Sequence, residues 1–505
     1  MTALVFVLGL VLALCPPPAG DPVAVKAALP AAEPAIAFVG VSVVPMDREA
    51  VLAGQTVVVR GDRIVALGPA GEVAVPEDAT RIDGAGRWLM PGLADMHVHT
   101  WTSDDFPLFL ANGVTTVRNM FGSAMQLEWR RQVAAGELLG PTILTAGPII
   151  DGDPPVWPGS TVLTDPAQAE QVVLDQQAAG YDFLKVYAGL TRPVYDALVA
   201  ASKAHGLRCM GHVPTDVGLD RVLEAAQATI EHLDGFAAAA QREGSPLAGK
   251  TDFRSSLAAW KHVDDERLAA LARRCAENGV WNCPTLVVLQ KWVGPEQAET
   301  LLARPEMQYV SPILIQFWDP ETSYLAKMPA EVLEATAASD ADRKRCVGIL
   351  HRHGARLLAG TDMGNPFVVA GFALHEELAN LVAAGLSPYE ALRAATSGAA
   401  EFMGAADEWG VVAAGRRADL LLLEANPLED VRHATRRVGV MVRGRWLEQA
   451  ELQGQLDELA ARFATTDDAA TQAATDAESD KATEPGSDAG TGAAPEPADE
   501  TSPRR

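Results

Sequence analysis

Cysteine pairs and basic charge are both scarce in this chain of 505 residues. No two of its five cysteines form a Cys-x-x-Cys pair, so neither a disulfide framework nor a cysteine-based zinc site is predicted. Acidic residues outnumber basic ones by 66 to 41, which gives a formal net charge of -25. Phosphate backbones repel such a chain, and we therefore expect no nucleic-acid partner.

Several enzyme signatures are also missing. The sequence holds no G-x-S-x-G turn of a serine hydrolase and no glycine-rich phosphate-binding loop. His375-Glu376 begins like a metalloprotease helix, but Ala379 stands where that motif requires its second histidine. These absences exclude three common kinds of catalytic site.

A long apolar run is absent as well. The run from Ala3 to Leu14 is too short to span a bilayer and is similar to the hydrophobic part of a secretory signal. We expect residues 1–20 to be a leader that directs export to the periplasm, the cell envelope or the medium. Cys15 follows the run and is a candidate for lipid attachment, which would tether the chain to a membrane. No basic residue precedes the run, so an unprocessed N-terminal extension stays open as the alternative.

Composition and periodicity divide the remaining chain into segments. Residues 21–36 are rich in Ala and Pro and predict a linker. Short strands with turn signals fill residues 37–87, including a hairpin turn at Gly61-Asp62, and strands return in residues 405–450. We expect these two segments to form one small β-sandwich accessory domain. Residues 451–465 predict a terminal helix, and residues 466–505 lack apolar periodicity and predict a disordered acidic tail.

Strands and helices alternate in residues 88–404. Ser387 and Glu390 form a capping box that opens a helix to about Met403. The segment from Leu289 to Asp340 is too long for a simple connection and predicts a lid or pocket wall, although its aromatic residues could equally pack on the helices. Eight candidate strands favour a (β/α)8 barrel and hence the α/β class. These strands are Ala94–His99, Val114–Asn119, Thr142–Ala146, Phe183–Tyr187, Arg208–Val213, Thr229–Leu233, Val280–Leu286 and Arg356–Thr361.

The first of these strands ends in a pair of histidines. Residues two apart on a strand point to the same side, so His97 and His99 would project together. Two neutral imidazoles in that arrangement can bind one divalent metal ion. The pair His351 and His353 has the same spacing on a predicted helix, where the two side chains diverge.

Other polar residues stand at the carboxyl ends of later strands, where catalytic groups of such barrels collect. Lys185 lies in an apolar strand, and a buried ammonium must find a partner or lose its charge. His212, His232 and Asp362 end the fifth, sixth and eighth strands. Each residue alone is more often structural than catalytic, but their concentration at one end of a single barrel predicts a site.

These motifs resemble the amidohydrolase superfamily of metal-dependent hydrolases, and most closely its imidazolonepropionase-like and prolidase-like members. The resemblance covers about Phe38 to Leu447. It includes the Pro-Gly-Leu-x-Asp-x-His-x-His opening, the strand of Lys185, the pairs Gly211-His212 and Glu231-His232, Gly360-Thr361-Asp362 and the late strand at Ala418-Asp419-Leu420. It implies a barrel on a β-sandwich built from both chain ends.

The resemblance also implies a role for each residue. His97 and His99 would bind the more buried of two divalent metal ions, which we expect to be zinc. Lys185, carboxylated on its amine, would bridge both ions, and His212 and His232 would hold the second. Asp362 would contact the first ion and act as the catalytic acid and base.

Two further residues are predicted to bind the substrate. Tyr187 follows Lys185 by two positions and would point to the same side, where its hydroxyl could bind a substrate carboxylate. Arg118 ends the second strand and would add a positive charge at the rim, or else form a salt bridge in the barrel wall. We expect hydrolysis of a C–N bond in a small amide or dipeptide. A cyclic-amide hydrolase, a deaminase, an ester or phosphotriester hydrolase and a non-catalytic envelope scaffold stay as alternatives, and so does assembly into a homo-oligomer.

Overall fold

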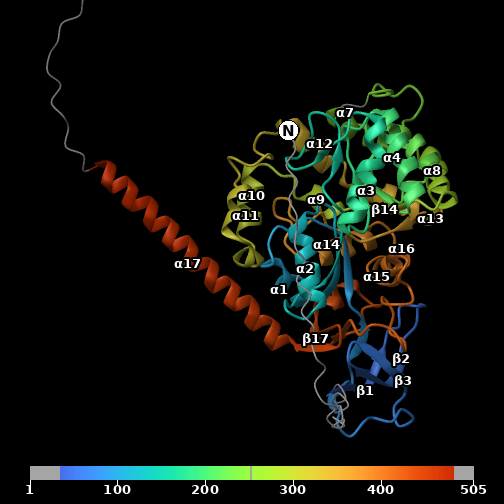
Figure 1. The fold of residues 1–505 in the computed structure, drawn as a ribbon, viewed down its shortest axis with the longest axis vertical. Coiled ribbons are helices and arrows are strands. Elements are labelled where there is room, and N and C mark those ends of the chain that lie inside the picture. Colours follow the sequence, from blue (N-terminus) through green and yellow to red (C-terminus); the bar gives the residue numbers. More distant parts are fainter. Residues whose placement is uncertain (1–33, 251–252, 483–505) are drawn as a thin grey trace, which may run out of the picture.

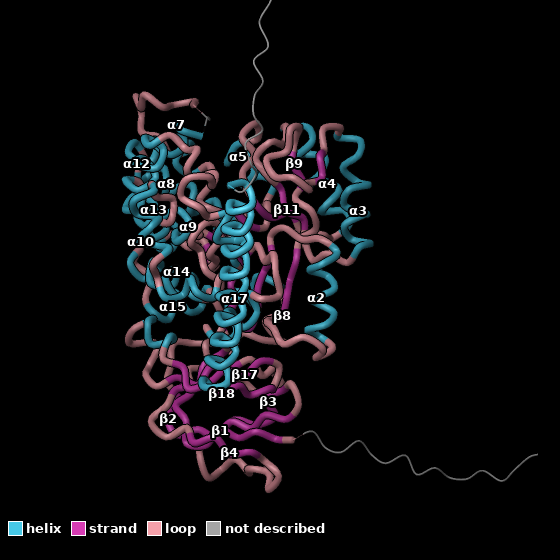
Figure 2. The backbone as a smooth tube through the Cα atoms, turned by 90° about the vertical axis from the view of Figure 1, so that its left-hand side faces the viewer, coloured by secondary structure: helices cyan, strands magenta, loops and turns pink. Residues whose placement is uncertain are grey.

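The computed structural model of this protein describes residues 34–250 and 253–482 and has a mixed α/β fold (Figure 1). One sheet occupies one end of the molecule, and the parallel strands with most of the helices lie beyond it (Figure 2). The predicted leader, Cys15 and nearly all of the predicted linker lie outside the described residues. Among the residues that are described, no helix is both long and apolar enough to cross a bilayer.

The sheet at one end draws strands from two distant parts of the chain. Its order is β18-β17-β16-β5-β1-β2-β3, and β4 pairs with β1. The predicted hairpin is confirmed, since Arg60 pairs with Arg63 across β2 and β3. The bounds are β1 Ala35–Val43, β2 Leu52–Arg60, β3 Arg63–Pro69, β4 Thr80–Asp83, β5 Trp88–Pro91, β16 Leu420–Leu423, β17 Arg437–Val442 and β18 Arg445–Glu448.

Strand β16 joins this sheet to the rest of the molecule. Its four leucines are all buried, and alternate side chains point to opposite faces. Leu420 and Leu422 belong to the core of the eight-stranded sheet, whereas Leu421 and Leu423 belong to the large core that holds the helices. The two cores therefore share one strand, which fixes the position of the sheet against the helical part.

The remaining strands run parallel in two sheets, one of order β6-β7-β8 and one of order β10-β9-β11-β12-β13-β14-β15. Isolated parallel bridges link the two sheets, from Ala146 after β8 to Phe183 before β11 and from Val98 in β6 to Met363 after β15. Most of these strands are fully buried, as expected when helices cover a parallel sheet. Their bounds are β6 Leu93–Val98, β7 Val114–Asn119, β8 Thr142–Thr145, β9 Ile150–Asp151, β10 Thr161–Val162, β11 Leu184–Val186, β12 Cys209–Gly211, β13 Thr229–Glu231, β14 Trp281–Cys283 and β15 Arg356–Leu357.

Helices follow most of these strands. The α-helices are α1 Asp105–Ala111, α2 Ala124–Ala134, α3 Ala169–Ala179, α4 Arg192–His205, α5 Gly218–Ala225, α6 Phe236–Ala239, α7 Phe253–Ala258, α8 Asp265–Glu277, α9 Leu286–Gln290, α10 Pro295–Leu302, α11 Pro312–Phe317, α12 Ala330–Ala338, α13 Asp340–Arg352, α14 Phe372–Ala383, α15 Pro388–Ala394, α16 Ser397–Met403 and α17 Gln449–Ala482. Short 3-10 turns are η1 Pro166–Gln168, η2 Ala259–His262, η3 Pro305–Tyr309 and η4 Val431–Thr435.

Several predicted boundaries were wrong. The helix expected from Ser387 to Met403 is two helices, because the chain leaves helical geometry at Thr396. Its predicted capping box at Ser387 and Glu390 is confirmed. Residues 88–91, which were predicted to belong to the alternating region, form strand β5 of the eight-stranded sheet, where it pairs with β1 and β16. Helix α17 runs beyond the predicted end at residue 465, which fits the abundant alanine, the strongest helix former, in that stretch.

Candidate metal centre

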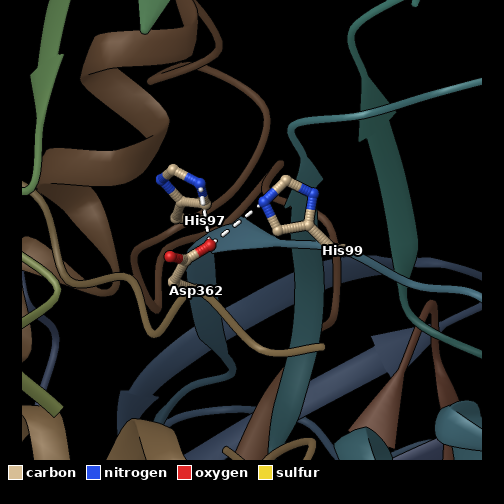
Figure 3. A group of neighbouring side chains, drawn as sticks. All are labelled: His97, His99 and Asp362. Atoms are coloured by element: carbon tan, nitrogen blue, oxygen red, sulfur yellow. Dashed lines mark ion pairs between the residues drawn. The ribbon is translucent and has the colours of Figure 1, made fainter. Parts of the chain in front are cut away.

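Two histidines and one carboxylate meet where β6 ends (Figure 3). His97 is the last but one residue of β6, and His99 follows its end. Both Nε2 atoms approach Oδ1 of Asp362, at 3.2 Å from His97 and 3.0 Å from His99. Asp362 lies more than 260 residues beyond the two histidines in the chain, yet the ligand atoms of the three side chains lie within 4.8 Å of one another. This group could hold a metal ion.

Two more histidines extend the cluster. His212 follows β12 and His232 follows β13. Their ring centroids lie 4.8 Å apart, and His232 lies equally close to His97. The structure therefore brings all four predicted histidines to one place, at the carboxyl ends of three parallel strands. Burial lowers the pKa of His99 to about 4 and that of His232 to about 3. Both rings are thus neutral at pH 7, as metal ligation requires.

In three of these rings, Nδ1 forms a hydrogen bond with an oxygen atom of a neighbouring side chain. Nδ1 of His97 lies 2.8 Å from Oε2 of Glu231, and Nδ1 of His212 lies 2.6 Å from Oδ2 of Asp234. Nδ1 of His232 pairs with the Thr285 hydroxyl at 2.7 Å. Such partners fix the ring orientation and leave Nε2 free for a ligand. The shared pattern is typical of metal-binding histidines.

Lys185 lies in the middle of β11 and has no exposed surface. Its Nζ makes no hydrogen bond in the part of the chain that the structure describes. Burial lowers its pKa from the ordinary value, although the charges of Glu231 and Asp362 act in the opposite direction. An unpaired ammonium in such a place costs free energy, so a chemical change or an added ligand that supplies a partner would stabilise it.

Asp362 occupies a strained backbone position. Its φ is +62°, in the left-handed region, and His232 and Thr285 share this property at +60° and +45°. Such conformations cluster at functional sites, where the surrounding structure holds them in place. Burial raises the pKa of Asp362, but electrostatic interaction with the neighbouring imidazoles of His97 and His232 outweighs it and holds that pKa well below its ordinary value. The group is therefore a carboxylate.

Tyr187 lies beside the cluster, as predicted. Its ring centroid is 4.1 Å from that of His212, and its hydroxyl accepts a hydrogen bond of 2.8 Å from Nε1 of Trp157. The hydroxyl hydrogen of Tyr187 is left to donate to another group.

Arg118 does not lie at the rim of the site, so the prediction that it adds a positive charge there was wrong. It has no exposed surface, and its guanidinium binds Glu231 at 2.9 and 3.1 Å. Nε also donates to the carbonyl of Met96. Arg118 therefore forms the salt bridge of the interior wall, and its indirect role is to hold the carboxylate that orients His97.

Sequence reasoning missed the partners of the histidines, namely Glu231, Asp234 and Thr285. Glu231 was part of a quoted motif but received no role. Asp95 was also overlooked: its carboxylate accepts hydrogen bonds from the backbone N–H of Thr361 at 3.0 Å and the Thr361 hydroxyl at 2.7 Å. It thereby ties β6 to the loop that carries Asp362. The sequence did offer a signal for the three acids, because each lies within two residues of a histidine that was predicted to bind metal.

The segment from residue 289 to 340 reaches the site through one of its aromatic residues. The Tyr324 hydroxyl donates to Oδ1 of Asn365 at 3.1 Å, and Nδ2 of Asn365 donates to the carbonyl of Asp362 at 2.9 Å. Trp318 is instead buried against Phe367, and Phe317 is 68% exposed. Only part of the predicted aromatic wall therefore faces the cluster.

The cluster fits a divalent metal ion. Nε2 of His97, Oδ1 of Asp362 and Nζ of Lys185 are buried without a hydrogen-bond partner among the described residues. Buried polar atoms are rarely left in this state, so their convergence indicates a ligand that binds all of them. Neutral imidazole and carboxylate are the donors that zinc and related ions prefer.

Comparisons with known proteins agree with this geometry. The model of the amidohydrolase family matches residues 88–447. Among solved structures, the chain is similar to a bottromycin amidohydrolase, with 28% identity, a TM-score of 0.69 and coverage of 85% of this chain and 90% of the other. A putative prolidase from Bifidobacterium longum is 24% identical, with a TM-score of 0.63 and coverage of 85% and 100%. An imidazolonepropionase of Stenotrophomonas maltophilia is 60% identical over 37 residues, which are 7% of this chain and 9% of that protein.

Proposed function

The chain belongs to the amidohydrolase family, and from that premise we propose a binuclear hydrolase that cleaves the amide bond of a small substrate. It is a metal-dependent hydrolase that acts on carbon–nitrogen bonds. The observation that carries the binuclear form of the proposal is the convergence of four histidines, Asp362 and the unpaired Lys185. Together they supply too many ligands for one tetrahedral ion.

The ligands divide into two groups. His97, His99 and Asp362 would hold the first ion, and His212 and His232 would hold the second. Lys185 would bridge the two as a carbamate, which turns an unpaired buried cation into an anionic oxygen ligand. Zinc is the ion that we propose, because its preferred donors are those present.

Two divalent ions supply Lewis acidity, which lowers the pKa of water and polarises a carbonyl. Asp362 would accept the proton of the attacking water and deliver it to the leaving nitrogen. The O–H of Tyr187, whose oxygen accepts from Trp157, would donate to a substrate carboxylate. Glu231, Asp234 and Thr285 keep three imidazole rings oriented while the charge in the site changes.

We interpret the eight strands β6, β7, β8 and β11 to β15 as a (β/α)8 barrel. The isolated bridges from β8 to the start of β11 and from β6 to the residues after β15 support closure. The eight-stranded sheet would then be the accessory domain from both chain ends. In this arrangement the cluster lies at the carboxyl end of the barrel, where such enzymes place their active sites. Export by the leader remains part of the proposal, and it concerns residues outside the described range.

The substrate class that we propose is a dipeptide or N-acyl amino acid with a free carboxylate. Tyr187 beside the cluster supports it, and similar folds include a putative prolidase and a Xaa-Pro dipeptidase with 19% identity and a TM-score of 0.60. A cyclic-amide hydrolase is the second candidate, supported by the short match to an imidazolonepropionase.

Metal analysis and a substrate panel test the proposal together. Protein reconstituted with zinc and bicarbonate is expected to hold close to two ions per chain and to cleave dipeptides or N-acyl amino acids. Asparagine tolerates the left-handed backbone at this position, so Asp362→Asn should retain the fold. Its kcat should fall by about 10²–10⁴-fold, because the amide cannot accept the proton. A preparation that never exceeds one ion would contradict the binuclear mechanism, and cleavage of lactams alone would favour the second candidate.

A further inference from the structure

An arc of four aromatic side chains borders the metal centre. Trp101 stacks on His99, with ring centroids 6.2 Å apart and planes 12° from parallel, and Phe121 meets Trp101 edge-on at 5.6 Å. Trp157 and Tyr187 continue the arc to His212. The two halves meet at Gly159, where a Cβ atom would lie 3.7 Å from the Phe121 ring. We call Trp101, Phe121, Trp157 and Tyr187 the aromatic arc.

The arc contains the two tryptophans that are exposed. All ten tryptophans of the chain lie within the described residues, and only Trp101 and Trp157, at 43% and 40%, are exposed. Large apolar side chains exposed beside a site that already holds the catalytic groups indicate a surface for an apolar part of the ligand.

The loop that carries Trp157 is held firmly in place. The buried carboxylate of Asp151 accepts hydrogen bonds from the backbone N–H of Gly152, Val156 and Gly189, at 2.8 to 2.9 Å. Gly189 belongs to the loop that follows Tyr187, so one carboxylate fastens both loops together. A Cβ atom at Gly152 would lie 2.1 Å from the carbonyl oxygen of Gly189, which shows how closely they approach. Trp157 is therefore presented in a fixed position next to Tyr187.

From this geometry we propose that the enzyme selects substrates whose carboxylate-bearing residue has an aromatic side chain, and that Trp157 determines this specificity. The inference rests on the proposed function, because it takes the Tyr187 hydroxyl as the anchor of the substrate carboxylate. A carboxylate bound there places the side chain of the same residue against the neighbouring indole. A phenyl or indole ring can stack on that face, whereas a methyl group leaves most of it in water.

Rate measurements test the specificity. Zinc-loaded enzyme is expected to cleave N-acetyl-L-phenylalanine with a kcat/KM about tenfold or more above that for N-acetyl-L-alanine. Trp157→Ala should reduce this ratio to about threefold or less. Trp157→Phe keeps an aromatic face and loses only the hydrogen bond to Tyr187, so it should retain most of the ratio. Val162→Ala is the matched control, because Val162 in β10 is an exposed apolar residue five positions after Trp157 and outside the arc, and its ratio should equal that of the unaltered enzyme.

Equilibrium binding separates this inference from the proposed function. Titration calorimetry with L-phenylalanine and L-alanine, the amino-acid products, needs no turnover. Tighter binding of phenylalanine that is lost in Trp157→Ala but kept in Trp157→Phe supports the inference even if no amide is cleaved, an outcome that would refute only the proposed function. Equal binding and equal cleavage of the two series would overturn the inference and leave the hydrolase intact. Equal losses in Trp157→Phe and Trp157→Ala would also overturn it, because the indole face would then play no part.

Discussion

The core of the eight-stranded sheet and the carboxyl ends of the parallel strands are both buried, but with opposite chemistry. The sheet places leucines on both faces of β16, and its cores are apolar. The strand ends bury His97, Lys185, Arg118 and Glu231 completely and bury most of His99, His212 and His232. Burial of an apolar group stabilises the fold, whereas burial of a charge costs free energy unless a partner offsets the cost. The first region is organised for stability and the second for chemistry.

The largest effect is expected from substitutions of Lys185, which should lower activity without lowering stability. Lys185→Ala should lose the second metal ion and about a thousandfold or more in kcat/KM, since bound ions contribute several kcal/mol to catalysis. Lys185→Arg should be as inactive, because a guanidinium cannot become an anionic ligand. Short carboxylic acids are expected to restore part of the activity of the alanine variant. Steady-state rates and metal content measure this outcome, and full activity in either variant would make Lys185 structural.

The same position should respond differently in unfolding experiments. Lys185→Met keeps the volume of the side chain and removes an unpaired buried cation, so the metal-free protein should be at least as stable as before. Denaturant unfolding measures the free energy. A large loss of stability in this variant would show that the Lys185 ammonium makes a stabilising interaction, and would contradict the view that its burial costs free energy.

Arg118 provides the opposite case within the same region. Arg118→Ala leaves Glu231 buried without its cationic partner and is expected to cost about 3–5 kcal/mol of unfolding free energy. Arg131→Ala is the matched control, because Arg131 pairs with Glu128 and Glu137 at the exposed surface of α2 and the turn after it, and its loss should change the unfolding free energy far less. Equal effects in the two variants, measured by urea unfolding, would contradict the assigned role of Arg118.

Substitutions in the eight-stranded sheet should change the free energy of unfolding and leave kcat unaltered. Leu422→Ala removes a fully buried side chain from the apolar core and should cost about 2–5 kcal/mol. Val65→Thr, at a half-exposed position of the same sheet, should change the stability by about 0.5 kcal/mol or less. Both proteins should keep the unaltered kcat under conditions in which they are folded. A lowered kcat in folded Leu422→Ala would mean that the sheet also positions the site.

The smallest effect is expected at the edge of the metal centre. Conversion of the substrate carboxylate to an amide should cost about 1.5–3 kcal/mol in kcat/KM, if charge-assisted hydrogen bonds hold it. Tyr187→Phe should lose part of the same preference while the zinc content stays unchanged. Rates for matched free and blocked dipeptides measure the difference, and equal rates in the unaltered enzyme would favour a lactam or ester hydrolase.

The sequence by itself determined which residues could form the site. His97 and His99 share a side because strand geometry alternates, and that local rule needs no knowledge of the rest of the fold. Lys185, His212, His232 and Asp362 were found because polar residues at the ends of apolar strands are unusual. The strand and helix alternation and the hairpin at Gly61-Asp62 were equally local, and the structure confirms the hairpin.

Only the tertiary structure decided which polar groups pair. Arg118 and Glu231 are 113 residues apart, and their salt bridge depends on how β7 and β13 are placed across the interior. The oxygen partners of the three imidazole rings and the left-handed backbone at Asp362 depend on contacts between strands and loops that are distant in the chain. Such contacts are set by spatial neighbours, whereas periodicity in a sequence reports only the neighbours along one strand or helix. The sequence therefore named polar residues that the structure brings together, and the fold decided which of them pair with each other.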